Sequence, residues 1–177
     1  MSGVHAAPFV QPASFKFTPE SLEQVNRHVA KYPKGRQQSA VMPLLDIAQR
    51  QNGGWLPEAA IRAIGEMLGM PYIRVYEVAS FYTMYNLAPV GRHFVQVCTT
   101  TPCWLRGSDA VMKACQHAAD GETFSVQEVE CLGGCVNAPV VQINDDFYED
   151  LDEASINKVL DAFRRGETPK PGPQVDR

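Results

Sequence analysis

The sequence has no hydrophobic run that approaches the ~20 residues needed to cross a membrane as a helix. It also has no basic stripe, and its formal net charge of −4 over 177 residues argues against nucleic acid as a partner. Residues 1–15 contain no lysine or arginine and no long apolar stretch, so they predict neither a secretory signal nor an arginine-rich transit peptide. If the protein works at a membrane, we expect other subunits to hold it there.

Motifs for nucleotide binding and for nucleophilic hydrolysis are also absent. There is no GxGxxG, no phosphate-binding Gly-Lys-Ser/Thr and no nucleophile elbow, so we expect the chain to bind no nucleotide by itself. Cysteine is scarce, and the odd count of five without a signal peptide argues against a disulfide framework. No Cys-x-x-Cys occurs, which argues against a thioredoxin-type redox dithiol.

Four of the five cysteines form two close pairs, each where a strand pattern breaks into a loop. The pairs are Cys98–Cys103 and Cys131–Cys135. A [2Fe–2S] cluster takes four thiolates, two on each iron, so each loop can serve one iron. A structural zinc site also uses four cysteines with short spacings, and spacing alone favours iron–sulfur only slightly. Cys115 lies on the apolar side of a predicted helix, and we expect it to be a small buried hydrophobe.

The residues beside these cysteines suit a buried negative cluster. Such a charge is costly unless hydrogen-bond donors point at it. Glycine lets a backbone N–H approach a sulfur closely, and threonine adds a hydroxyl donor. Two acidic residues before the third cysteine would oppose an added electron, so we expect a low reduction potential. These neighbours are Gly133, Gly134, Thr99, Thr100, Thr101, Glu128 and Glu130.

The first half of the chain predicts helices and the second half a mixed pattern. Residues 17–86 have the periodicity of four short helices, which form a small bundle with Phe81 in its core. Residues 93–98 then predict a strand, followed by a helix, a second strand, a hairpin and a last helix. If the first strand–helix–strand unit is a right-handed parallel crossover, both cysteine loops reach one edge of the sheet. This order also matches the core of a thioredoxin-like domain.

The predicted fold class is therefore α+β, with a helical bundle followed by a thioredoxin-like domain. We expect a flexible or partner-bound arm over residues 1–16 and the helical bundle over 17–90. The thioredoxin-like domain should occupy residues 91–166, and a proline-rich extended tail should occupy 167–177.

Several segments resemble the small two-iron subunit of NADH:quinone oxidoreductase, respiratory complex I. The likeness covers roughly residues 17–173. It rests on the segments Asp46–Asn52, Val75–Asn86, Val97–Cys103, Glu128–Pro139, Val141–Asn144 and Tyr148–Leu151.

The resemblance implies a [2Fe–2S] cluster on Cys98, Cys103, Cys131 and Cys135, the same four residues that the spacing indicates. It also implies a partner subunit that binds NADH and FMN, whose flavin would exchange one electron with this cluster. No NADH or FMN site can be assigned in this chain, so an active site complete in this chain alone is not expected.

Two alternatives remain open from the sequence. Related subunits serve soluble NAD-reducing hydrogenases and NAD-linked formate dehydrogenases, and a zinc-stabilised interaction module without a redox role is a different class. The peripheral arm of complex I implies the cytoplasmic face of a bacterial inner membrane, or else the matrix side of the mitochondrial inner membrane. The absence of a predicted transit peptide favours the bacterial location.

Overall fold

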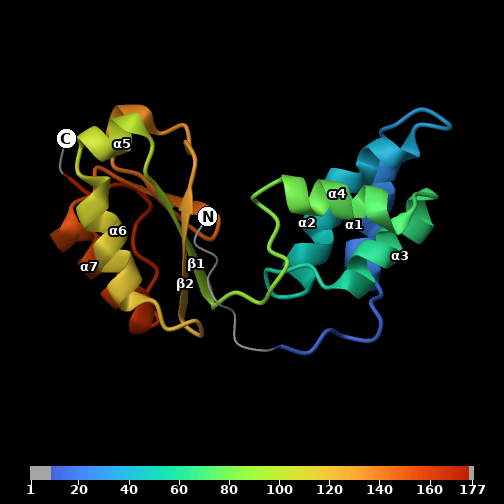
Figure 1. The fold of residues 1–177 in the computed structure, drawn as a ribbon, viewed down its shortest axis with the longest axis horizontal. Coiled ribbons are helices and arrows are strands. Elements are labelled where there is room, and N and C mark those ends of the chain that lie inside the picture. Colours follow the sequence, from blue (N-terminus) through green and yellow to red (C-terminus); the bar gives the residue numbers. More distant parts are fainter. Residues whose placement is uncertain (1–8, 176–177) are drawn as a thin grey trace. The chain divides into compact units, whose positions relative to one another are not determined.

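The computed structural model describes residues 9–175 and divides the chain into two compact units. One unit ends at Pro89, its described residues form helices and no strand, and we call it the helical unit (Figure 1). The other begins at Val90 and contains a five-stranded mixed sheet with helices, and we call it the sheet unit. The predicted α+β class is confirmed.

The helical unit has four α-helices among its described residues. They are α1 (Pro19–Val29), α2 (Val41–Gln51), α3 (Glu58–Leu68) and α4 (Tyr72–Phe81), with a 3₁₀ turn, η1 (Gln37–Ala40), before α2. Thr18 caps α1, because its hydroxyl accepts a hydrogen bond from the Ser21 N–H at 3.2 Å. Gly69 ends α3 in the left-handed conformation at φ 63°. The predicted small bundle is confirmed.

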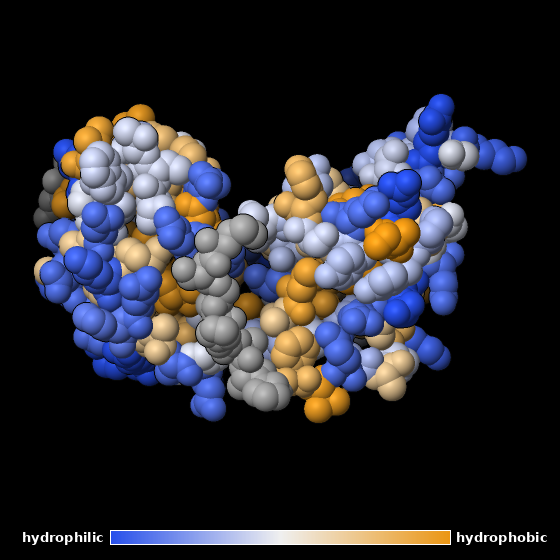
Figure 2. All heavy atoms as spheres, viewed as in Figure 1, coloured by the Kyte–Doolittle hydropathy of each residue, from blue (hydrophilic) through white to orange (hydrophobic). Residues whose placement is uncertain are grey.

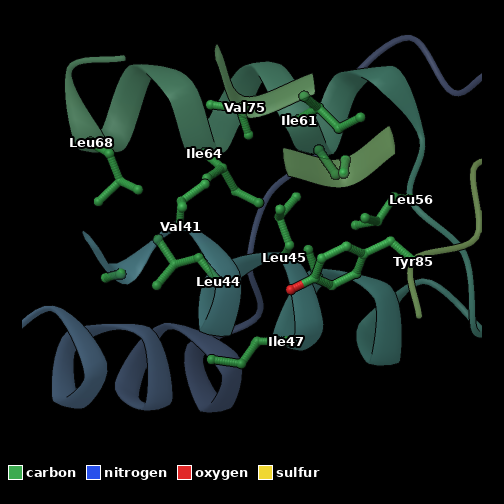
Figure 3. Close-up of a cluster of buried hydrophobic side chains, with 14 of the residues drawn as sticks. Val41, Leu44, Leu45, Ile47, Leu56, Ile61, Ile64, Leu68, Val75 and Tyr85 are labelled. Atoms are coloured by element: carbon green, nitrogen blue, oxygen red, sulfur yellow. The ribbon is translucent and has the colours of Figure 1, made fainter. Parts of the chain in front are cut away.

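Aliphatic side chains from α2, α3 and α4 form the core of the helical unit (Figure 3). Leu44 and Leu45 of α2 face Ile61 and Ile64 of α3, and all four are almost fully buried. Tyr85 follows α4 and closes one end of this core, where its hydroxyl donates to the Met42 carbonyl at 2.9 Å. Burial raises the pKa of this phenol to about 12, so it remains a donor at neutral pH.

The prediction that Phe81 belongs to the core is wrong. The sequence pattern continues helically to Tyr85, but α4 ends at Phe81 and Tyr82 is extended. The helical periodicity therefore stops at Phe81, whose side chain is 76% exposed, while Tyr85 returns to the core at 6% exposure.

Pro43 does not disrupt α2, because it lies in the first turn of that helix, where a backbone N–H has no helical partner.

The described part of the N-terminal segment lies against its own helical unit. The Phe9 ring meets the Trp55 ring edge-on at 5.3 Å, and the Gln11 side chain accepts from the Glu58 N–H at 3.1 Å. From Phe9 onward, then, this segment has intramolecular partners. The first eight residues of the predicted arm lie outside the described residues.

The sheet unit has the strand order β2-β1-β3-β4-β5. Its strands are β1 (His93–Cys98), β2 (Phe124–Val129), β3 (Val141–Ile143), β4 (Asp146–Glu149) and β5 (Gly172–Pro173). Strands β1 and β2 are parallel, and β3 pairs antiparallel with both β1 and β4. The predicted parallel crossover and hairpin are confirmed. The extended tail adds the short strand β5 beside β4, which the sequence did not predict.

Helices α6 (Ser108–Ala118) and α7 (Glu153–Arg164) lie side by side on one face of the sheet (Figure 1). Val95 and Val97 of β1 point into the core that these helices cover, and both are fully buried. Asp152 begins α7 through a capping box with Ser155. The remaining α-helix of the unit, α5 (Thr101–Leu105), lies between β1 and α6 in the chain.

Asp120 fixes the turn that leads into β2. Its Oδ1 accepts hydrogen bonds from the N–H groups of Phe124 at 3.0 Å, Thr123 at 2.6 Å and Glu122 at 2.9 Å. These bonds, of which the one from Phe124 contributes most to the shift, lower the pKa of this carboxyl from 3.8 to about 2. The charged form therefore stabilises the folded state above pH 3.8, and this contribution is lost as the pH falls towards 2.

Replacing Asp120 by asparagine is expected to lower the melting temperature at pH 6, because a neutral amide oxygen accepts these three bonds less strongly. The difference from the unmodified protein should shrink as the pH falls from 4 to 2, where Asp120 itself becomes protonated. Thermal unfolding at several pH values measures this effect. A constant difference across the whole range would contradict the assigned role.

Candidate metal centre

The two cysteine pairs lie at the same end of the sheet unit. Cys98 is the last residue of β1, and its parallel partner in β2 is Val129, two residues before Cys131. Because parallel strands end at one edge of a sheet, both segments begin together there. Cys103 lies on α5, and Cys135 begins the 3₁₀ turn η2 (Cys135–Asn137). The predicted meeting of the two segments at one sheet edge is therefore confirmed.

Within each pair the two thiols are direct neighbours. The sulfurs of Cys131 and Cys135 are 3.4 Å apart, and the thiols of Cys98 and Cys103 are close enough that each shifts the pKa of the other. Two thiolates bound at about 2.3 Å to one tetrahedral metal lie roughly 3.8 Å apart. The Cys131–Cys135 separation is close to that value. Over residues 9–175, no three His, Cys, Asp or Glu side chains gather around a single point as a metal site, so the arrangement is one of pairs.

Contacts between the two segments bring the pairs together. Hydrogen bonding from the Leu132 N–H, next to Cys131, lowers the pKa of Cys98, and hydrogen bonding from the Thr100 hydroxyl lowers the pKa of Cys131, so each segment acts on a thiol of the other. Cys98 and Cys103 are buried with Val140 and Ala138 in a small cluster, whereas Cys131 and Cys135 are exposed. The first pair thus forms the inner wall of the site and the second pair its outer wall.

The environment lowers the pKa of two of the four thiols and raises the pKa of the other two. Burial opposes ionisation of Cys98, but hydrogen bonds from Thr100 and the Leu132 N–H outweigh it and lower its pKa. The Gly133 N–H lowers the pKa of Cys131. Burial raises the pKa of Cys103 to about 11, and the bond to Cys131 raises the pKa of Cys135. Each pair therefore has one thiol whose pKa is lowered and one whose pKa is raised, and the thiolate is the form that binds metal.

The glycines beside Cys131 have separate roles. Gly133 has φ 83°, a conformation that glycine adopts without a side-chain clash, and its N–H points at the Cys131 sulfur at 3.4 Å. A Cβ on Gly134 would lie 3.0 Å from Cγ2 of Val140, so this position is closely packed. The predicted approach of a backbone donor to a cysteine sulfur is confirmed at Gly133.

The polar residues near the cysteines are mostly paired with one another. Thr99 donates its hydroxyl to a Glu128 carboxylate oxygen at 2.6 Å, and Asn137 donates its amide to Glu149 at 2.5 Å. The Asn137 side-chain oxygen is buried, with no partner among the described protein atoms. Asn137 also receives the Asp150 N–H on its backbone carbonyl at 2.7 Å, which fixes the turn after Cys135.

The placement of Cys103 on a helix was missed in the sequence. The signals were present, because Thr100 is a favourable N-cap residue and Pro102 stands in the first turn of α5. Cys115 lies on α6 and is fully buried, as predicted, and burial raises its pKa to about 12. It belongs to the core under the sheet, in a different cluster from Cys98 and Cys103.

Exposed hydrophobic side chains accompany the cysteines. Trp104 and Leu105 follow Cys103 and are 57% and 71% exposed, and Val136 follows Cys135 at 92% exposure. Figure 2 shows hydrophobic atoms at the surface of the sheet unit at the end where α5 lies. We call Trp104, Leu105 and Val136 the sulfur-side patch.

No described helix is long and apolar enough to cross a membrane.

A comparison with known families gives a match over residues 25–164 to the thioredoxin-like [2Fe–2S] ferredoxin model. The chain belongs to this family. The donor set fits the family's cluster, because four thiols in two pairs meet at one sheet end with backbone and hydroxyl donors directed at the sulfurs.

A bacterial protein and a mitochondrial protein are similar in sequence to most of the chain. A subunit of the NADH-quinone oxidoreductase of Rickettsia conorii is 54% identical over 159 residues, which is 85% of this chain and 95% of that protein. The mitochondrial NADH dehydrogenase [ubiquinone] flavoprotein 2 of Dictyostelium discoideum is 52% identical over 171 residues, 92% of this chain and 69% of that protein. The predicted family of small two-iron subunits is confirmed.

The fold is also similar to part of a solved NAD⁺-reducing [NiFe]-hydrogenase in its air-oxidised state. The TM-score is 0.58 at 21% sequence identity, over 69% of this chain and 23% of that chain. At this identity the likeness concerns the fold alone.

Proposed function

We propose that Cys98, Cys103, Cys131 and Cys135 hold a [2Fe–2S] cluster and that the chain is an electron-transfer subunit of NADH:quinone oxidoreductase. In this proposal the cluster exchanges one electron with the FMN of the adjacent subunit, which oxidises NADH. The observation that carries the proposal is the meeting of two thiol pairs at one end of a thioredoxin-like sheet. The relatives with 52–54% identity favour this complex.

The residues of this chain would bind and shield the cluster. Each thiol pair supplies two ligands to one iron, and the N–H groups of Leu132 and Gly133 offset the negative charge on the sulfurs. The inner pair excludes water through burial, whereas the outer pair faces the surface. An exposed outer pair gives the electron a short path to a partner.

The sulfur-side patch supports a partner that docks over the outer pair. Apolar side chains exposed beside a redox site are typical of a protein interface, which also excludes water from the site. We propose that the flavin- and NADH-binding subunit covers this patch within the peripheral arm of the complex. The location would then be the cytoplasmic face of a bacterial inner membrane or the matrix side of the mitochondrial one.

Spectroscopy of the purified full chain after anaerobic loading with iron and sulfide tests the cluster. We expect visible absorption that bleaches on reduction and an EPR signal that accounts for one electron per two irons. The same signal should form when NADH is added in the presence of the flavin-binding partner. A colourless, EPR-silent protein that binds one zinc ion would refute electron transfer and support the zinc-stabilised interaction module.

Co-purification distinguishes the remaining alternative. Recovery of the chain with quinone-reducing subunits supports the proposal, and recovery with a soluble hydrogenase or formate dehydrogenase would overturn it. The fold likeness to the NAD⁺-reducing hydrogenase is the observation behind this second candidate.

Charge in the sulfur-side patch should weaken docking. Leu105→Asp and Val136→Asp are each expected to raise the dissociation constant for the flavin-binding partner by about tenfold or more, because an unpaired carboxylate would be buried in the interface. Val175→Asp, on a 48% exposed side chain after β5, is the matched control and should bind normally. Calorimetric titration measures the three constants. Unchanged binding by both patch variants would show that the flavin-binding partner does not dock on the sulfur-side patch.

A further inference from the structure

The three consecutive threonines after Cys98 differ in what their side chains contact. Thr99 donates its hydroxyl proton to a Glu128 carboxylate oxygen at 2.6 Å, so this hydroxyl does not donate to a sulfur. Thr101 begins α5 and is exposed. The hydroxyl of Thr100 lies 3.3 Å from the sulfur of Cys98, within the range of a hydrogen bond to sulfur. Thr100 therefore differs from its two neighbours, because its hydroxyl lies beside a cysteine sulfur.

Thr100 stands at a helix N-cap, yet its hydroxyl does not cap the helix. An N-cap threonine normally accepts a hydrogen bond from an N–H of the first helical turn. Thr100 precedes α5 and makes no such bond, and its hydroxyl lies beside the Cys98 sulfur instead. Its carbonyl accepts from the Trp104 N–H at 2.9 Å, which holds the Thr100 backbone in place.

The hydroxyl of Thr100 thus contacts the sulfur of Cys98, one of the four proposed ligands of the cluster. A metal-bound thiolate has no proton to give, so the O–H of Thr100 must be the donor. A hydrogen bond to a ligand sulfur is stronger when an added electron makes that sulfur more negative.

We propose that Thr100 is a positioning residue that raises the reduction potential of the cluster by donating its hydroxyl proton to a ligand sulfur. This inference rests on the [2Fe–2S] cluster in the proposed function. The electron enters from an external reductant, which is dithionite in the test and the flavin-binding partner in the complex. No bond of the protein forms or breaks.

Redox titration of the full chain loaded with its cluster tests this role, with the EPR signal of the reduced form as the readout. Thr100→Val removes the hydroxyl at nearly constant size. It is expected to lower the reduced-to-oxidised ratio at a fixed potential about three- to tenfold, which corresponds to roughly 30–60 mV for one electron. Thr100→Ser keeps a hydroxyl and should restore the original potential.

Thr99→Val is the matched control, because it removes the neighbouring hydroxyl, which contacts Glu128 and not a sulfur. The reduction potential of Thr99→Val should lie closer to that of the unmodified protein than the reduction potential of Thr100→Val does. An unchanged potential in Thr100→Val, or an equal shift in both valine variants, would overturn the role of Thr100.

Thr100→Ala is a second variant, in case valine is too bulky beside the sulfurs. It should show the same lowered potential as Thr100→Val. If valine and alanine both prevent loading while Thr100→Ser and Thr99→Val load normally, the hydroxyl serves cluster assembly and tuning is refuted. An unmodified chain that never gains iron and sulfide would refute the cluster itself, which is a separate outcome.

Discussion

The Cys131→Ala variant is expected to lose the visible absorption and the EPR signal of the cluster almost completely. One iron would keep a single thiolate of its pair, and the N–H bond from Gly133 at 3.4 Å would lose its acceptor. A cluster that requires four cysteine thiolates does not form stably with three. Iron and sulfide analysis after anaerobic loading, together with the two spectra, measures the loss.

Cys115→Ala is the control for this experiment. Cys115 is fully buried on α6, outside the small hydrophobic cluster that contains Cys98 and Cys103. This variant is expected to take up iron and sulfide as the unmodified protein does. Loss of iron in Cys115→Ala, or full loading in Cys131→Ala, would contradict the assignment of the ligands.

Replacing Leu45 by alanine should destabilise the helical unit by about 2–5 kcal/mol, the range for deleting a fully buried leucine side chain. Leu45 of α2 is completely buried in the core that faces α3, where a cavity would remain (Figure 3). Denaturant unfolding followed by tryptophan fluorescence measures the change. A Trp104→Phe background leaves Trp55 as the single tryptophan, and Trp55 lies in the helical unit.

Phe81→Ala is the matched control in the same unit. Its side chain is 76% exposed, so its removal is expected to change the free energy of unfolding by no more than about 0.5 kcal/mol. A large loss of stability in Phe81→Ala would restore the sequence-based expectation that Phe81 belongs to the core. Equal effects of the two substitutions would contradict the packing seen in this unit.

Local signals in the sequence predicted most of the elements. Thr18 and Asp152 are such signals, because each side chain caps a helix by accepting a hydrogen bond from an N–H three residues along the chain. Gly69 ends α3 for a similarly local reason. The end of α4 was misjudged, because the choice between Phe81 and Tyr85 as the buried ring depends on contacts with α2.

Residue spacing and short-range periodicity indicated the α+β class and the two cysteine pairs, and the resemblance of several segments to known two-iron subunits indicated the family. Only the folded chain shows which cysteine of each pair is readier to ionise, and which threonine lies beside a sulfur. It also shows that Thr99 is engaged by Glu128, a residue far away in the chain. Such partners come together only when β1 and β2 pair in the observed register, and the residue pattern along the chain does not predict that register.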